Sequence, residues 1–175
     1  MILPIIIYGK SILNNSILRK KCVNISNSFP KLNLLISNMF DTMYNVKGIG
    51  LAAPQIGKNI KLFIVDMLYV LKHNKQLSSK NYKKVFINAK IIKSFGKTVV
   101  FKEGCLSIPN IIELVKRKSH ILIRYYDEYW NIHTEILNGL QARIVQHEYD
   151  HLYGKLFIDR LSTFKKNIYK KLFRI

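Results

Sequence analysis

Gln146-His147-Glu148-Tyr149-Asp150-His151 is the stretch that decides how this chain folds. It contains the pattern His-Glu-x-x-His, and Gly154 follows three residues later. On an α-helix, residues four apart share one face, so His147 and His151 can ligate one metal ion with Glu148 beside them as a base. The stretch therefore predicts a metal-binding helix, and Gly154 occupies the position expected for its C-terminal cap. The alternative interpretation is a solvated helix with an accidental His pair.

The third metal ligand distinguishes between classes of metallohydrolase. Metallopeptidases with this motif need a further ligand downstream, but Asp159 is the only acidic residue after His151 and no His follows. Upstream, Cys105 lies between a strand-like run and a proline. A thiolate at this residue, together with two imidazoles, would leave one coordination position on the metal ion for water. The other cysteine, Cys22, has no motif around it and is expected to be a buried, inert thiol.

Three segments together resemble the motifs of the peptide deformylases, in the family's order and spacing. They are Gly48-Ile49-Gly50-Leu51-Ala52-Ala53-Pro54-Gln55, Glu103-Gly104-Cys105-Leu106-Ser107 and Gln146-His147-Glu148-Tyr149-Asp150-His151-Leu152-Tyr153-Gly154. The resemblance extends from about residue 5 to about residue 162. It implies hydrolysis of the formyl group from the N-terminal formylmethionine of nascent polypeptides, with release of formate.

The resemblance also implies a role for each matching residue. The metal ligands would be Cys105, His147 and His151, and the metal would make a bound water acidic enough to attack the formyl carbon near neutral pH. Glu148 would take the water's proton and pass it to the leaving amine. The oxyanion would be stabilised by the side-chain amide of Gln55 and the backbone N–H of Leu106. Substrate-binding positions would be Gly48, Ile49, Gly50, Glu103, Gly104, Leu140 and Ile144.

The glycines of the first motif have a matching physical role. Without a Cβ, Gly48 and Gly50 let another backbone approach closely, and a peptide could pair there like an added strand. Taken alone, the segment could equally be an ordinary glycine-rich turn.

Ligand types do not identify the metal, because Cys and His suit zinc, iron, cobalt and nickel. The resemblance implies one Fe²⁺ per chain, which Zn²⁺, Ni²⁺ or Co²⁺ could replace. A ferrous ion beside a thiolate is expected to make the enzyme sensitive to oxygen.

Two acidic neighbours are predicted to support the site. Asp150 should orient a ligand or pair with a basic side chain, and Glu103 should pair with Arg117. One position departs from the family, since many deformylases carry arginine where this chain has Ile112, which should change the shape and polarity of the pocket rim. The remaining histidines lack ligand spacing and are expected on strands or at the surface: His73, His120 and His133.

The pattern of the whole chain predicts an α+β domain, with short mixed or antiparallel strands packed around the central His-Glu-x-x-His helix and with N-terminal and C-terminal helices. A helix is expected over residues 30–44, where apolar residues recur at helical spacing. Short strands are expected at 61–66, 85–92 and 98–102, a hairpin at 121–136, and a lysine-rich surface loop at 72–84. At 175 residues, the chain is expected to form a single catalytic domain over 1–175.

The charge is the second unusual feature, with 29 Lys and Arg against 10 Asp and Glu, a formal net charge of +19. This excess favours polyanions without DNA sequence specificity, and for a deformylase it suggests the ribosome near its tunnel exit. The tail at about 162–175 is expected to be a basic amphipathic helix that docks there. The alternative is a genomic bias toward lysine.

The remaining expectations concern location and rival functions. The chain shows no signal peptide, transit peptide or membrane helix, and its two cysteines favour a reducing compartment. We therefore expect a monomer in the bacterial cytoplasm, with an organelle as the alternative. A metallopeptidase is disfavoured because the metal ligand that it needs downstream of His151 is missing. A non-enzymatic RNA-binding protein would explain the charge but not the three motifs. An inactive family member would have lost Glu148 or Gln55, and both are present.

Overall fold

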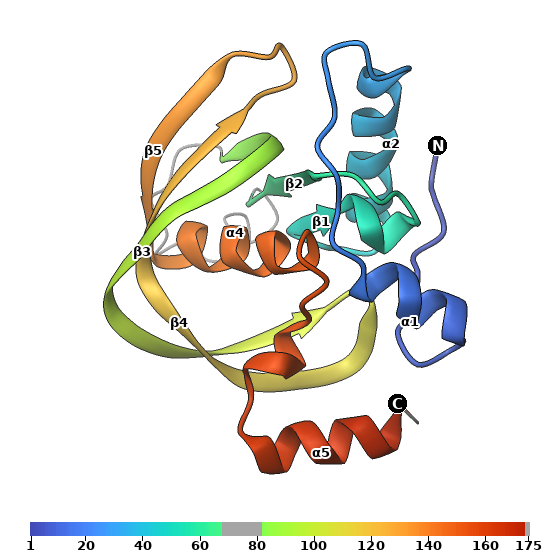
Figure 1. The fold of residues 1–175 in the computed structure, drawn as a ribbon, viewed down its shortest axis with the longest axis vertical. Coiled ribbons are helices and arrows are strands. Elements are labelled where there is room, and N and C mark those ends of the chain that lie inside the picture. Colours follow the sequence, from blue (N-terminus) through green and yellow to red (C-terminus); the bar gives the residue numbers. More distant parts are fainter. Residues whose placement is uncertain (68–81, 174–175) are drawn as a thin grey trace.

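A computed structural model describes residues 1–67 and 82–173 of the chain. Its sheet has the strand order β1-β2-β3-β4-β5, and every neighbouring pair is antiparallel. Figure 1 shows α4 lying inside the curve of the long strands. The elements in chain order are α1 (Ile12–Arg19), α2 (Leu32–Asn45), β1 (Gly50–Ala52), η1 (Ala53–Ile56), β2 (Leu62–Asp66), β3 (Lys83–Cys105), β4 (Ile108–Tyr126), β5 (Ile132–Asn138), α4 (Gly139–His151), η2 (Phe157–Arg160) and α5 (Thr163–Leu172).

The predicted α+β class and the central motif helix are confirmed, as are helices before and after the sheet. The strand predicted at 61–66 is confirmed as β2, and the hairpin predicted at 121–136 is confirmed by the pairing of β4 with β5. The other predicted strands were too short. Residues 85–92 and 98–102 belong to one strand, β3, and β4 begins at Ile108, well before the predicted hairpin. The apolar pattern breaks around Lys93 and Gly96 because this part of β3 is exposed to solvent. The pairing of β3 with β4 shifts register here, and such bulges bend a strand without ending it.

The first three strands separate two layers of core packing. Side chains alternate between the faces of a strand, and here both faces are apolar. Phe63 and Phe86 on one face pack in a cluster with Val145 of α4. Leu62 and Ile64 on the other face pack in a cluster with residues of α2, including Met39 and Met43. The sheet is therefore covered by α4 on one face and by α2 on the other.

The predicted helix at 30–44 is confirmed as α2, whose buried residues recur at helical spacing. The loop predicted at 72–84 lies outside the described residues except at its end, where Lys83 and Lys84 already belong to β3. Cys22 is buried as expected, and burial raises the pKa of its thiol to about 11.

Gly154 does not cap α4 directly, because the helix ends at His151 and its cap residue is Leu152. Instead it forms the turn that follows, with a φ of +66°, and packs against α1. A Cβ built on Gly154 would lie 2.1 Å from the carbonyl oxygen of Arg19. The glycine is therefore required both by its backbone conformation and by the close approach of another chain segment.

Replacing Gly154 with alanine is expected to lower the free energy of unfolding by about 2 kcal/mol or more, because left-handed strain and a backbone clash combine. Gly139→Ala is the matched control, since Gly139 also has a positive φ, +53°, but nothing lies within 4 Å of its Cβ position. Urea unfolding of both variants measures the difference. Equal losses of stability would contradict the role of the Arg19 contact.

Candidate metal centre and active site

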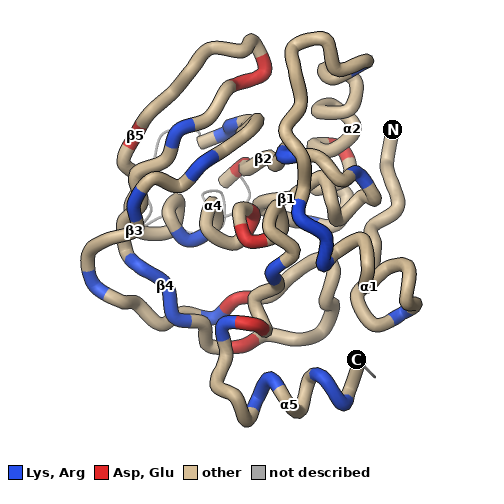
Figure 2. Tube along the Cα trace, viewed as in Figure 1, with Lys and Arg blue, Asp and Glu red and all other residues tan. Residues whose placement is uncertain are grey.

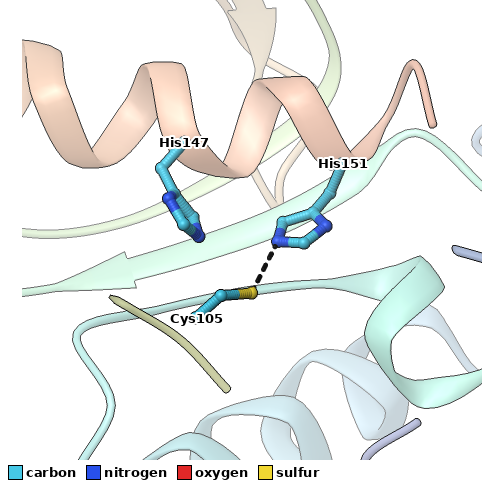
Figure 3. A group of neighbouring side chains, drawn as sticks. All are labelled: Cys105, His147 and His151. Atoms are coloured by element: carbon cyan, nitrogen blue, oxygen red, sulfur yellow. Dashed lines mark hydrogen bonds between the residues drawn. The ribbon is translucent and has the colours of Figure 1, made fainter. Parts of the chain in front are cut away.

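Three metal-ligating side chains converge beneath α4. Cys105 lies at the end of β3, while His147 and His151 project from one face of α4 toward it, as Figure 3 shows. One ligand atom from each lies within 4.8 Å of the others. The Sγ of Cys105 is 3.3 Å from Nε2 of His151. The fold thus brings the three predicted ligands together from separate elements.

The surroundings of this group fit a bound transition metal ion. Nδ1 of His147 lies 3.1 Å from a carboxylate oxygen of Glu103, an arrangement that leaves Nε2 free to coordinate. Nδ1 of His151 is buried without a hydrogen-bond partner in the described part of the chain. One thiol and two imidazoles form a donor set that suits zinc, iron, cobalt or nickel.

Glu148 lies beside the ligands and is buried, with 4% of its surface exposed. Its Oε2 has no hydrogen-bond partner among the described residues. Burial raises the pKa of its carboxyl to about 7, so the group can both accept and release a proton near neutral pH. A Cβ on Gly50 would lie 2.4 Å from Oε1 of Glu148, which explains why this strand carries glycine here.

The side chain of Gln55 has one defined orientation. Its Oε1 accepts a hydrogen bond of 2.8 Å from the backbone N–H of Ala52, so the amide nitrogen must point the other way. That nitrogen donates to Oγ of Ser107 at 3.2 Å and lies 3.5 Å from Sγ of Cys105. Gln55 therefore presents an N–H donor to the centre, next to the turn that contains Leu106.

A cavity of about 620 Å³ opens onto this group. All seven predicted substrate-binding residues line it: Gly48, Ile49, Gly50, Glu103, Gly104, Leu140 and Ile144. Gln55, Cys105, Leu106, His147 and Glu148 line it as well. Ile112 is in its wall and is 68% exposed, so the rim is apolar at this point.

Comparison with known proteins agrees with this geometry. The family model described as polypeptide deformylase matches residues 2–167. The chain belongs to the polypeptide deformylase family. It is 56% identical over 165 residues to the peptide deformylase of Karelsulcia muelleri, covering 94% of this chain and 81% of that protein. It is 48% identical over 176 residues to that of Flavobacterium psychrophilum, covering 98% and 88%.

Solved structures show the same fold. A peptide deformylase from Legionella pneumophila superposes with a TM-score of 0.82 at 33% identity, covering 99% of this chain and 94% of that one. A deformylase from Synechococcus elongatus, in complex with actinonin, superposes with a TM-score of 0.81 at 33% identity, covering 99% and 86%. The chain is therefore a hydrolase of the N-formyl amide bond at an N-terminal methionine.

In this deformylase, Glu103 connects His147, one of the candidate metal ligands, to a buried ionic network. The predicted pair with Arg117 is confirmed, since Nε and Nη2 of Arg117 donate to the two oxygens of Glu103 at 2.6 and 2.8 Å. Nη1 of Arg143 donates to Glu103 at 2.6 Å. Burial would raise the pKa of Glu103, but hydrogen bonds from His147 and Arg117 outweigh it and hold the pKa well below its ordinary value. The carboxylate therefore stays ionised.

Asp150 pairs with basic side chains, as predicted. Arg117 donates to it at 2.8 Å, and Arg160 donates through Nε and Nη2 at 2.6 Å each. Arg143 and Arg160 were not predicted from the sequence. Arg143 could have been found, because it lies four residues before His147 on the same helical face; Arg160 lies beyond the end of α4 and carries no such signal.

The described histidines that were not predicted as metal ligands lie away from the candidate metal centre. His133 pairs with Asp127 at 2.8 Å near the β4–β5 turn, and His120 contacts Ser119 at 2.8 Å. His73 lies outside the described residues. Within the described chain, no helix is long and apolar enough to span a membrane.

Glu103→Gln should lower the free energy of unfolding of the metal-free protein by about 3 kcal/mol, because Arg143 loses its carboxylate partner and Arg117 keeps only Asp150. Metal affinity should fall about 10- to 100-fold, since His147 loses its charged partner. Urea unfolding and chelator competition measure the two effects. As the control, Glu113→Gln removes a charge from a pair with Lys165 at the surface and should cost less than about 1 kcal/mol. Wild-type metal retention in Glu103→Gln would show that the carboxylate does not support the centre.

Proposed function

We propose that deformylation here uses Cys105, His147 and His151 as metal ligands, with Glu148, Gln55 and Leu106 acting on the substrate. The observation that carries this proposal is that Gln55, Cys105, Leu106, His147 and Glu148 line one cavity, while His151 joins Cys105 and His147 in the group that could hold a metal ion. A divalent metal held there would supply a Lewis acid and lower the pKa of a water molecule.

Glu148 performs the proton transfers. Its carboxylate accepts a proton from the attacking water and then delivers it to the leaving amine, which lets the C–N bond break without expelling an amide anion. Burial beside Gly50 places its pKa close to neutrality, so both transfers are accessible at one pH.

Gln55 and Leu106 stabilise the charge that develops on the formyl oxygen. The Nε2 of Gln55 is already oriented by the Ala52 contact, so no reorganisation is needed when the oxyanion forms. The backbone N–H of Leu106 is the second donor and lies in the turn between β3 and β4.

The nascent peptide binds along the glycine-rich segment. Gly48, Ile49 and Gly50 lie at β1, an edge strand of the described sheet, where a peptide backbone can add hydrogen bonds. Glu103 and Gly104 form the opposite wall, while Leu140 and Ile144 of α4 offer an apolar surface to the methionine side chain.

Formate release from formyl-Met-Ala-Ser by anaerobically purified protein tests the residue assignments. Glu148→Ala should lose activity by at least about 100-fold, the contribution expected of a general acid–base, while keeping about one metal ion per chain. Glu128→Ala is the control, because Glu128 lies in the β4–β5 turn outside the cavity. Full activity of Glu148→Ala would contradict the proposed role. Cleavage of unformylated peptides instead would favour a metallopeptidase.

We further propose that the physiological metal is Fe²⁺, with Zn²⁺, Ni²⁺ or Co²⁺ able to replace it. Cys105 is only partly buried, so oxygen species that reach the open cavity can oxidise its thiolate. Iron-loaded enzyme should lose activity in air, whereas the nickel or cobalt form should keep it. Formate assays and metal analysis over time measure this loss. An iron enzyme that stays active in air with its metal bound would contradict the proposal.

We also propose that the protein acts as a monomeric single-domain enzyme over 1–175, in the cytoplasm of a bacterium or in an organelle. We further propose that it docks near the ribosomal tunnel exit through α5. One side of α5 is anchored, as Tyr169 donates to Glu113 at 2.8 Å and Phe173 contacts Tyr8. The other side is free, with Phe164 and Leu172 74% and 62% exposed. Figure 2 shows the basic residues along this helix.

Replacing Phe164, Ile168 and Leu172 with serine should weaken ribosome binding by about tenfold or more, because three apolar side chains lose their burial in the complex. Co-sedimentation with ribosomes measures the affinity, and deformylation of a short peptide should not change. Ile12→Ser/Leu13→Ser is the control, since α1 also exposes two apolar residues. Unchanged ribosome affinity in the α5 variant would rule out docking through this helix.

A further inference from the structure

The structure contains a second, polar cavity that shares no lining residue with the active site. Its volume is about 450 Å³, and it lies between β3, β4 and the chain segments around Lys61 and Tyr153. The lining residues are Asn24, Lys61, Asn88, Ala89, Lys90, Arg124, Tyr125, Tyr126, Ile132 and Tyr153. They include three cationic side chains and no carboxylate.

The three cations of this cavity lack counter-charges. No ion pair within the described chain includes Lys61, Lys90 or Arg124, although these three side chains gather at one cavity. Lys90 and Arg124 are direct partners in the β3–β4 register. Like charges that face each other across a strand pair are destabilising, and an anion between them would remove that cost.

The backbone around the cations is held rigidly. Asn88 has a φ of +51° and lies at the register shift between Ile87 and Lys90, where a bulge redirects the following side chains. Its side-chain amide donates to the carbonyl of Ile25 at 2.7 Å and accepts from the N–H of Ile25 at 3.0 Å. Its backbone N–H donates to the carbonyl of Lys61 at 2.8 Å. These bonds hold the backbone at Lys61 next to the bulge that precedes Lys90.

An aromatic ring completes the cavity. Tyr153 is half-buried, and the ammonium groups of Lys21 and Lys61 lie 5.7 and 5.4 Å from the centre of its ring. The ring of Tyr149 packs against it with a centroid distance of 4.9 Å, which limits its rotation. An aromatic platform beside unpaired cations is the combination that binds single-stranded nucleic acids through stacking and phosphate contacts.

We propose that this cavity binds a single-stranded segment of RNA. Lys61, Lys90 and Arg124 contact consecutive phosphates, and one base stacks on Tyr153. An acidic protein segment would pair with the cations but has no base to stack on the ring of Tyr153, so the observations favour RNA. The site is separate from α5 and from the catalytic cavity, and it does not depend on the proposed roles of either.

Fluorescence anisotropy with a labelled 12-nucleotide single-stranded RNA tests this proposal over a range of salt concentrations. Lys90→Gln/Arg124→Gln should bind at least tenfold more weakly, and the slope of log affinity against log salt should fall by about 1.4, for two lost phosphate contacts. Lys97→Gln/Lys116→Gln is the control, because it removes the same charge from exposed positions on the same β3–β4 ribbon. This control should change affinity less than about threefold.

A third variant separates stacking from charge. Tyr153→Leu should weaken binding about fivefold or more with an unchanged salt slope. Equal losses in the two double variants would show that net charge alone attracts RNA and would overturn the proposal. Displacement of the RNA by poly-glutamate as readily as by unlabelled RNA, or by inorganic phosphate at comparable concentration, would overturn it too. Formate release within twofold of wild type confirms that each variant is folded; if the double variant fails that check, Lys61→Gln supplies the same comparison.

Discussion

The buried guanidinium of Arg117 holds this molecule together at the point where its chemistry takes place. Arg117 extends from β4 and joins Glu103 of β3 to Asp150 of α4, each through hydrogen bonds of 2.6 to 2.8 Å. Two buried carboxylates without this partner would each carry a large desolvation cost. The same contacts set the distance between the strand that carries Cys105 and the helix that carries the two histidines. Packing brings the elements together, and this ionic network fixes their relative positions.

Apolar packing provides the frame for that network. β1, β2 and the first part of β3 are buried on both faces, between α2 and α4. α4 therefore runs through the interior, although five of its eight buried residues are polar or charged. Such a helix is stable only if its polar groups are satisfied there. Gln146 shows how this happens, since its amide donates to the carbonyls of Lys118 and Ala142. Glu148 and His151 are the exceptions on this helix, each with one buried polar atom that has no hydrogen-bond partner among the described residues, and such atoms are typical of functional positions.

The residues of the candidate site could be predicted from the sequence more completely than the extents of the strands. The helical spacing of His147 and His151 and the three linked motifs identified the residues that the fold brings together, because ligand chemistry restricts residue types strongly. The continuous course of β3 was not predictable, since the segment from Lys93 to Lys97 contains two lysines, a serine and a glycine and resembles a turn. Its pairing partner lies in β4, and only that pairing shows it to be a strand. Arg160 was missed for the same reason, because its contact with Asp150 depends on the turn at Gly154.

The ligands of the metal centre are far apart in the chain, and this affects how the enzyme matures. Cys105 ends β3, whereas the histidines belong to α4, which follows β4 and β5 in the chain and lies inside their curve. Arg160, which completes the pairing of Asp150, follows later still. With the proposed ligands, an emerging fragment that lacks α4 offers only Cys105 to a metal ion. An ion held by all three residues would therefore mark a chain in which α4 is in place.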